Sequence, residues 1–178
     1  MEDYDKSLEL SSIDGVEIYF DTKWLFNKTL GADLNSADLL VRLLAIDNYI
    51  GKNDFGFALY NEMKQKRIAT NNEIPNASTR NYEKDFKKLI KSISENGYID
   101  KNPVELNKNF EVFDGAHRLV CALALNIEKI PVRFSSKYIN KNYDYSIEWF
   151  KKNGLTYMEE PILKKYKELK DKKIILGD

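Results

Sequence analysis

Residues 113–118 read Phe113-Asp114-Gly115-Ala116-His117-Arg118 and stand where a predicted strand ends and a predicted helix begins. Residues 110–113 predict a short strand, because they include aromatic and β-branched residues. Downstream, residues 119–125 are apolar on every side, which is typical of a buried helix. The first turn of a helix presents unpaired backbone N–H groups and about half a positive charge. This stretch therefore predicts an anion-binding turn between a strand and a helix.

Each residue type in this turn suits a phosphate group. Gly115 permits close approach of the backbone, and Ala116 adds no bulk beside it. His117 and Arg118 supply hydrogen-bond donors within the first helical turn. Asp114 is placed to hold Mg²⁺ or a reacting hydroxyl at the edge of the same site. The alternative, in which Asp114 is an ordinary helix cap and the glycine turn is only structural, stays open.

Periodic patterns continue on both sides of this turn. Phe86, Leu89, Ile90 and Ile93 form an apolar stripe that predicts an amphipathic helix ending at Asn96-Gly97. Short strands are predicted at residues 103–106, 110–113 and 130–134, with a hairpin at 107–109 and a helix stop at Asn126.

The preceding part of the chain predicts one strand and two helices. Val16, Ile18 and Phe20 alternate with polar residues as in a strand. A helix capped by Asn35 or Ser36 runs to Gly51, and a second helix carries an apolar face. That face consists of Phe55, Leu59 and Met63. Residues 68–80 have no periodicity and predict a connection.

The part after residue 135 predicts two helices. Asp144 is the expected cap of a helix through Trp149 and Phe150 that stops at Asn153-Gly154. The last helix carries Ile162, Tyr166 and Leu169. Its start has two registers that the sequence leaves open, with Pro161 in the first turn or with a Thr156/Glu159 capping box.

Composition excludes several kinds of site. The 178 residues carry a formal net charge of zero, one cysteine and one histidine. Because Cys121 is the single cysteine and His117 the single histidine, a disulfide framework, a Cys/His zinc site and catalysis by a second histidine are excluded. Zero net charge argues against sequence-independent binding of nucleic acid. No apolar run reaches the roughly 20 residues of a membrane span, and the acidic start differs from a signal peptide, so a cytoplasmic protein is expected.

Residues 80–134 resemble the ParB N-terminal/sulfiredoxin superfamily. The resemblance rests on an amphipathic helix ending Ile-Ser-Glu-Asn-Gly, a Pro-Val strand, Phe-Asp-Gly-Ala-His-Arg-Leu, and an Ile-Pro-Val strand, in that order. It implies an α+β fold with a small mixed β-sheet and a nucleotide-binding core. It also implies that Gly115, Ala116, His117 and Arg118 bind nucleotide phosphates.

The branches of that superfamily differ at residues that can be compared here. Ala116 stands where a sulfiredoxin has its reactive cysteine, so that activity is excluded. Only 44 residues follow Phe134, too few for the DNA-reading and dimerisation domains of the segregation CTPases. The branch of free-serine kinases remains, which phosphorylate a small hydroxyl compound. The resemblance implies Mg²⁺ at Asp114, ATP or ADP as donor with CTP as a further candidate, and an acidic base at Glu83 or Asp85.

Three ranges organise the prediction: an N-terminal strand and helical cap (1–79), the core (80–135) and C-terminal helices (136–178), with the last two helices packed on the sheet. Lys52, Asn53, Asp54 and Arg67 are the predicted contacts to a polar acceptor, such as an amino acid, a polyol or a sugar. The leading function is a nucleotide-dependent kinase for a small polar metabolite. The alternatives are a regulatory module that hydrolyses nucleotide slowly or not at all and, behind it, a DNA-associated ParB-like protein. The sequence does not indicate an oligomeric state.

Overall fold

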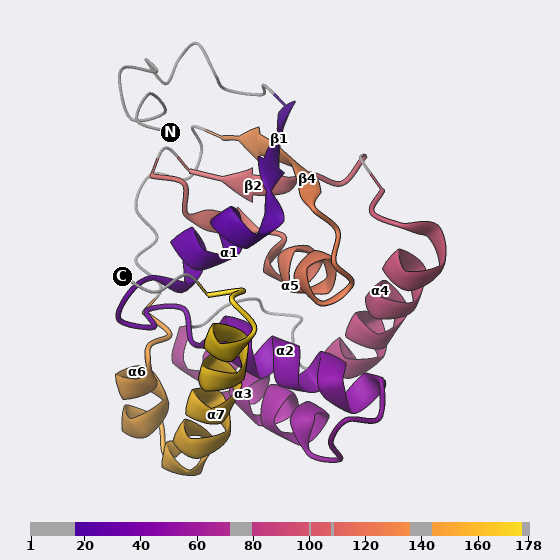
Figure 1. Cartoon of the computed structure of the whole chain (residues 1–178). Helices are drawn as coiled ribbons and strands as arrows, with labels where there is room; N and C mark the ends of the chain where they lie inside the picture. The colour runs from indigo at the N-terminus through magenta and orange to yellow at the C-terminus, as the bar shows by residue number, and fades with distance from the viewer. Residues whose placement is uncertain (1–16, 72–79, 100, 108, 136–143, 176–178) are drawn as a thin grey trace.

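A computed structural model describes residues 17–71, 80–99, 101–107, 109–135 and 144–175 (Figure 1). These residues form four strands, seven α-helices and one 3₁₀ helix, which confirms the α+β class. The elements in chain order are β1 (Glu17–Asp21), α1 (Thr22–Leu30), α2 (Asp38–Tyr49), α3 (Gly56–Asn71), α4 (Tyr82–Asn96), β2 (Val104–Leu106), β3 (Val112–Asp114), α5 (Ala116–Ala124), β4 (Lys129–Phe134), α6 (Ile147–Lys152), η3 (Thr156–Met158) and α7 (Glu159–Asp171).

The four strands form one mixed sheet in the order β1-β4-β2-β3. β1 pairs with β4 antiparallel, β4 with β2 parallel, and β2 with β3 antiparallel. Val132 of β4 lies opposite Ile18 on one side and Val104 on the other. Burial of Val104, Leu106, Ile130 and Val132 explains why these short apolar segments form strands. The small mixed sheet that the sequence predicts is therefore confirmed.

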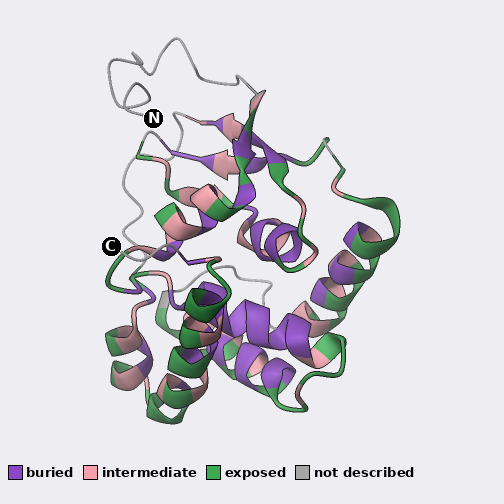
Figure 2. Ribbon diagram, in the orientation of Figure 1, coloured by how far each residue is buried: buried purple, intermediate pink, exposed green. Residues whose placement is uncertain are grey.

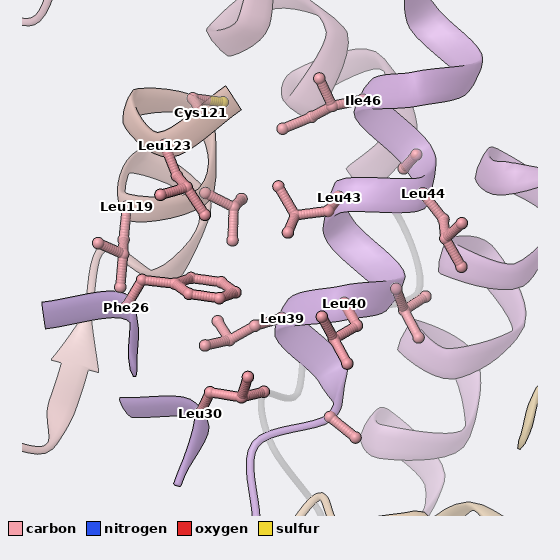
Figure 3. Packing of buried hydrophobic residues seen from close by; sticks show 14 of the residues in the cluster. Phe26, Leu30, Leu39, Leu40, Leu43, Leu44, Ile46, Leu119, Cys121 and Leu123 are labelled. Atoms are coloured by element: carbon pink, nitrogen blue, oxygen red, sulfur yellow. The ribbon is translucent and has the colours of Figure 1, made fainter. Parts of the chain in front are cut away.

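Helices are stacked beneath the sheet. α5 lies directly below it, and α2 follows below α5 (Figure 1). α2 is buried on nearly every side (Figure 2), and its buried residues include Asp38, Arg42 and Asp47 as well as the apolar ones. Figure 3 shows Leu39, Leu43 and Ile46 of α2 pointing toward α5, while Leu44 points toward the other side. α2 is thus the central helix against which the neighbouring elements pack.

The C-terminal helices differ from the prediction in their position. α7 packs on α2 rather than on the sheet. The contact includes an ion pair between the buried side chain of Lys165 and Asp47, with 2.6 Å from Nζ to Oδ2. The lysine-rich sequence around Lys165 predicts a solvated helix face. The ion pair with Asp47 of α2 explains why Lys165 is buried instead.

Helix α1 is absent from the prediction. Asp21, the last residue of β1, caps it by accepting a hydrogen bond of 2.7 Å from the backbone nitrogen of Trp24. Trp24 is partly buried and stacks on Phe20 with 5.3 Å between ring centroids. The acidic residue at the end of β1 was the available signal for this helix.

Two predicted boundaries are wrong. Residues 68–71 belong to α3 and not to a connection, while residues 72–79 and 136–143 lie outside the described chain. Ala37 precedes α2 with no side-chain cap, so neither Asn35 nor Ser36 has the predicted role. Backbone carbonyls take the place of a side-chain cap, because the nitrogens of Leu39 and Leu40 donate to the carbonyl oxygens of Ser36 and Ala37 at 3.0 Å each.

The caps of the last helices are also corrected. Ser146 caps α6, while Asp144 accepts a hydrogen bond of 2.9 Å from the nitrogen of Ser146. Pro161 lies in the first turn of α7, as one predicted register has it, and Met158 precedes that helix without a side-chain cap. Within the described residues, none of the helices combines the length and apolarity needed to cross a membrane.

Candidate functional site

Gly115 connects β3 to α5 in a left-handed backbone conformation, with φ at 97°. A Cβ atom at this position would lie 2.9 Å from Nη2 of Arg118 and 3.1 Å from Cα of Val104. Backbone and side-chain neighbours therefore leave room only for glycine. The helix begins with no side-chain cap, so its first turn is open to another hydrogen-bonding partner.

Arg118 is held against the ends of two strands. Its Nη2 donates to Oδ2 of Asp114 at 2.8 Å and to the carbonyl oxygen of Pro103 at 3.1 Å. Asp114 itself is 65% exposed. The guanidinium group is therefore fixed at the first turn of α5, and the Asp114 carboxylate lies at the solvent edge, where the sequence predicts it.

His117 is part of an aromatic cluster beneath the turn. Its Nε2 lies 2.9 Å from the hydroxyl oxygen of Tyr60, and its ring meets Phe86 edge-on at 4.7 Å between centroids. Burial lowers the pKa of His117 well below 6.5, and four nearby cations lower it further. Those cations are Arg42, Lys64, Arg67 and Arg80. His117 is therefore neutral at pH 7.

A His117 that is neutral in the folded chain predicts loss of stability in mild acid. The unfolded chain takes up a proton at this residue near pH 6.5, whereas the folded chain does so only at lower pH. This contribution is complete above pH 6.5 and is lost as the pH falls toward the folded-state pKa, by up to about 1.4 kcal/mol per pH unit. Urea denaturation at several pH values measures the slope, which His117→Gln should flatten. An equally steep slope in that variant would assign the effect to other groups.

A cavity of about 200 Å³ opens between the starts of α4 and α5, and we refer to it as the α4–α5 cavity. Arg80 and Asp85 enter it from the α4 side and form an ion pair with 2.9 Å from Nε to Oδ2. Its lining combines the first turn of α5 with charged and aromatic groups, namely Tyr60, Arg80, Tyr82, Asp85, Phe86, Leu89, Asp114, Gly115, His117 and Arg118.

The two predicted bases have different positions. Asp85 lines the α4–α5 cavity, and Glu83 does not. The Glu83 carboxylate accepts hydrogen bonds from Nζ of Lys87 at 2.5 Å and from Nδ2 of Asn61 at 2.6 Å. Both hydrogen bonds lower the pKa of Glu83, and the bond from Lys87 has the larger effect. A carboxylate that is already paired and has a lowered pKa is the weaker candidate for a base.

A larger cavity of about 380 Å³ lies on another side of the α5 start, where Ala116 lines it. Its deepest charged groups are Asp38 and Arg42 of α2 and Arg67 of α3, and we call it the arginine cavity. Nη1 of Arg42 and Nη1 of Arg67 both donate to Oδ2 of Asp38, the second at 3.1 Å. The sequence predicts Arg67 as a site residue but not Asp38 or Arg42. Asp38 and Arg42 lie four residues apart, which also fits an ordinary surface ion pair, so their spacing alone does not mark them as site residues.

The other predicted acceptor contacts lie in the loop between α2 and α3. Lys52, Asn53 and Asp54 line neither of the two cavities. The Asn53 side chain donates to the carbonyl oxygen of Leu44 at 3.1 Å and accepts from the nitrogen of Gly56 at 2.8 Å. Asn53 therefore has a structural role in this loop, and the acceptor role of these three residues stays a prediction.

The described residues include no cluster of three or more His, Cys, Asp or Glu side chains arranged to hold a metal ion by themselves. Asp85 and Asp114 do line the same cavity. Mg²⁺ is commonly bound by one or two carboxylates together with substrate phosphates. These two residues therefore fit a metal ion that arrives with a nucleotide.

Comparisons with known protein families, with curated proteins and with solved structures give no match to this chain.

Proposed function

We propose that this chain binds a nucleotide at the first turn of α5 and transfers its terminal phosphoryl group to a hydroxyl of a small polar metabolite. One observation carries the proposal. The α4–α5 cavity brings the uncapped start of α5 together with two cations, Arg80 and Arg118, and two carboxylates, Asp85 and Asp114. Phosphoryl transfer asks a protein mainly for such positioning and charge stabilisation.

The phosphate groups would lie against the backbone of residues 115–118. The close approach at Gly115 and the positive end of the α5 dipole favour negative charge there. Arg118 provides a cation that is already held by Asp114 and Pro103, so little side-chain entropy is lost on binding. Arg80, on the far side of the cavity, is the second cation.

Asp85 is the better placed of the two candidate bases. In the proposed reaction, the acceptor oxygen forms a bond to the terminal phosphorus, and the bond from that phosphorus to its bridging oxygen breaks. The shortened nucleotide leaves, and the hydroxyl proton passes to the Asp85 carboxylate. Mg²⁺, when bound by Asp114, would neutralise phosphate charge.

The resemblance of residues 80–134 to the ParB N-terminal/sulfiredoxin superfamily supports the same proposal. A second candidate, nucleotide binding without transfer, is favoured by one observation. Both acids at the start of α4 are already paired, Asp85 with Arg80 and Glu83 with Lys87. If Asp85 must first break its ion pair with Arg80 to act as the base, phosphoryl transfer would be slow.

Nucleotide binding predicts a gain in thermal stability. With Mg²⁺ and one of ATP, ADP, CTP or GTP at 100 times its Kd, the unfolding temperature should rise by about 5–11 °C. Arg118→Ala should abolish the rise. Arg133→Ala is the matched control, because this half-buried arginine of β4 lines neither cavity. No rise with any nucleotide would contradict the proposal. If nucleotide binds, phosphate transfer that Asp85→Asn abolishes supports the kinase, and binding without transfer supports the second candidate.

A further inference from the structure

The arginine cavity contains more buried positive than negative charge. Asp38 is 5% exposed and Arg42 is 3% exposed, and the side chain of Arg67 is 13% exposed. One carboxylate therefore faces two guanidinium groups at the bottom of the cavity. Removing an unbalanced charge from water is unfavourable unless an opposite charge joins it. The floor of the cavity therefore favours an anion with a single charge.

The two guanidinium groups also have unused donors. Both ion pairs with Asp38 use Nη1. Nε of Arg42 and Nε of Arg67 are buried and have no hydrogen-bond partner in the part of the chain that the structure describes. A buried donor without a partner destabilises the folded state. An anion bound beside the two guanidinium groups would offset part of that penalty through its charge.

The rim of the cavity limits the charge of its occupant. Lys28, Glu111 and Asp144 are exposed and line the opening. Their charges are screened by water, and two of the three are acidic. A dianion such as a phosphate monoester would meet two carboxylates at the entrance. A monoanion needs only the single excess positive charge on the floor.

We infer that the arginine cavity is a binding site for a small monocarboxylate. A planar carboxylate matches the fork of a guanidinium group with two parallel hydrogen bonds. The guanidinium group of Arg67 is held in place, because it lies over the Tyr145 ring at 3.9 Å while Asp38 accepts a hydrogen bond from Nη1. The volume of about 380 Å³ accommodates a molecule of several heavy atoms. This site is separate from the α4–α5 cavity and does not depend on the proposed function.

The experiment uses the full chain without nucleotide or Mg²⁺. Sodium acetate and sodium lactate are titrated at constant ionic strength against sodium chloride, and the unfolding temperature is followed. At ten times its Kd, a bound carboxylate should raise this temperature by about 3–6 °C over chloride. Arg42→Met leaves one arginine balanced by Asp38 and should abolish the shift.

A conservative variant keeps the test valid if Arg42→Met does not fold. Arg67→Lys retains the charge but lacks the fork, and it should weaken carboxylate binding at least tenfold. Arg118→Ala is the control outside the cavity and should bind carboxylate as the wild type does. The inference is overturned by no carboxylate shift in the wild type, by equal shifts in the wild type and the cavity variants, or by a shift with inorganic phosphate alone. Loss of nucleotide binding in Arg118→Ala with the carboxylate shift intact separates this site from the proposed kinase site.

Discussion

Asp38→Ala is expected to lower the free energy of unfolding by about 3–5 kcal/mol, the usual effect of removing one partner from a buried ion pair. Asp38 accepts from Nη1 of Arg42 and from Nη1 of Arg67, and it also belongs to the first turn of the central helix α2. Its removal leaves two buried guanidinium groups without a carboxylate. Urea denaturation of the full chain, in a buffer without carboxylate anions, measures the loss.

Asp33→Ala is the matched control, because Asp33 is an exposed acid in the connection before α2 and should change stability by less than about 0.5 kcal/mol. Asp38→Ala combined with Arg42→Met should recover part of the loss by removing one of the two uncompensated charges. A loss below about 1 kcal/mol in Asp38→Ala would mean that water or an anion already balances the arginines.

The same ion pairs give Asp38 a dependence on pH. Burial raises the pKa of Asp38, but Arg42 and Arg67 more than offset this, so its pKa lies below 3.8. The stability that the carboxylate supplies is present above its unfolded-state pKa and is lost as the pH falls through the folded-state pKa. The contribution of Asp38 to stability should therefore be complete at neutral pH and decrease as the pH falls below about 3.8.

Local patterns predicted most of the secondary structure because they depend on neighbours in sequence. The stripe through Phe86, Ile90 and Ile93 matches the buried face of α4, and Gly97 ends that helix with φ at 73°. The predicted positions of β2, β3, α5 and β4 also agree with the structure. Of these segments, α4 and β2 have a buried face whose period is visible in the sequence alone.

Arrangement in space was less predictable, because it depends on contacts between distant residues. The parallel pairing of β2 with β4 and the packing of α7 on α2 have no local signal. α1 was missed for a related reason. Its sequence Thr-Lys-Trp-Leu-Phe-Asn-Lys-Thr-Leu is short and contains β-branched and aromatic residues, so burial of Leu25 and Phe26 stabilises it more than its propensity does.

The two cavities of the candidate site differ in the same way, because one is built from a local segment and the other from distant residues. The turn at residues 113–118 was visible because one short segment holds all its chemistry, and Asp85 joined it through the recognised start of α4. The arginine cavity was missed because its parts lie on α2 and α3. Asp38 and Arg42 look like an ordinary exposed helix pair until the burial of α2 is known. Conversely, Asn53 appears available in a polar loop, yet its amide bonds the backbone.

Gly56→Ala is expected to destabilise the fold by about 3 kcal/mol, at the upper end of what overpacking usually causes. Gly56 is the first residue of α3 and is buried against α2. A Cβ atom here would lie 1.9 Å from the carbonyl oxygen of Leu44 and 2.8 Å from the nitrogen of Ala45. Both atoms are backbone, so no side-chain rotation relieves the contact, and α2 and α3 would have to separate. Thermal and urea unfolding measure the effect.

Gly51→Ala separates steric exclusion from backbone strain. Gly51 lies just after α2 in a left-handed conformation with φ at 78°, and a Cβ atom there would have no neighbour within 4 Å. Only the conformational penalty of an L-residue remains, about 1 kcal/mol. Because Asn53 also bonds the Leu44 carbonyl, separation of the helices in Gly56→Ala should break that bond and displace the loop. A loss in Gly56→Ala no larger than in Gly51→Ala would mean that α2 and α3 have room between them, and that the close packing of the central helix does not determine the position of α3.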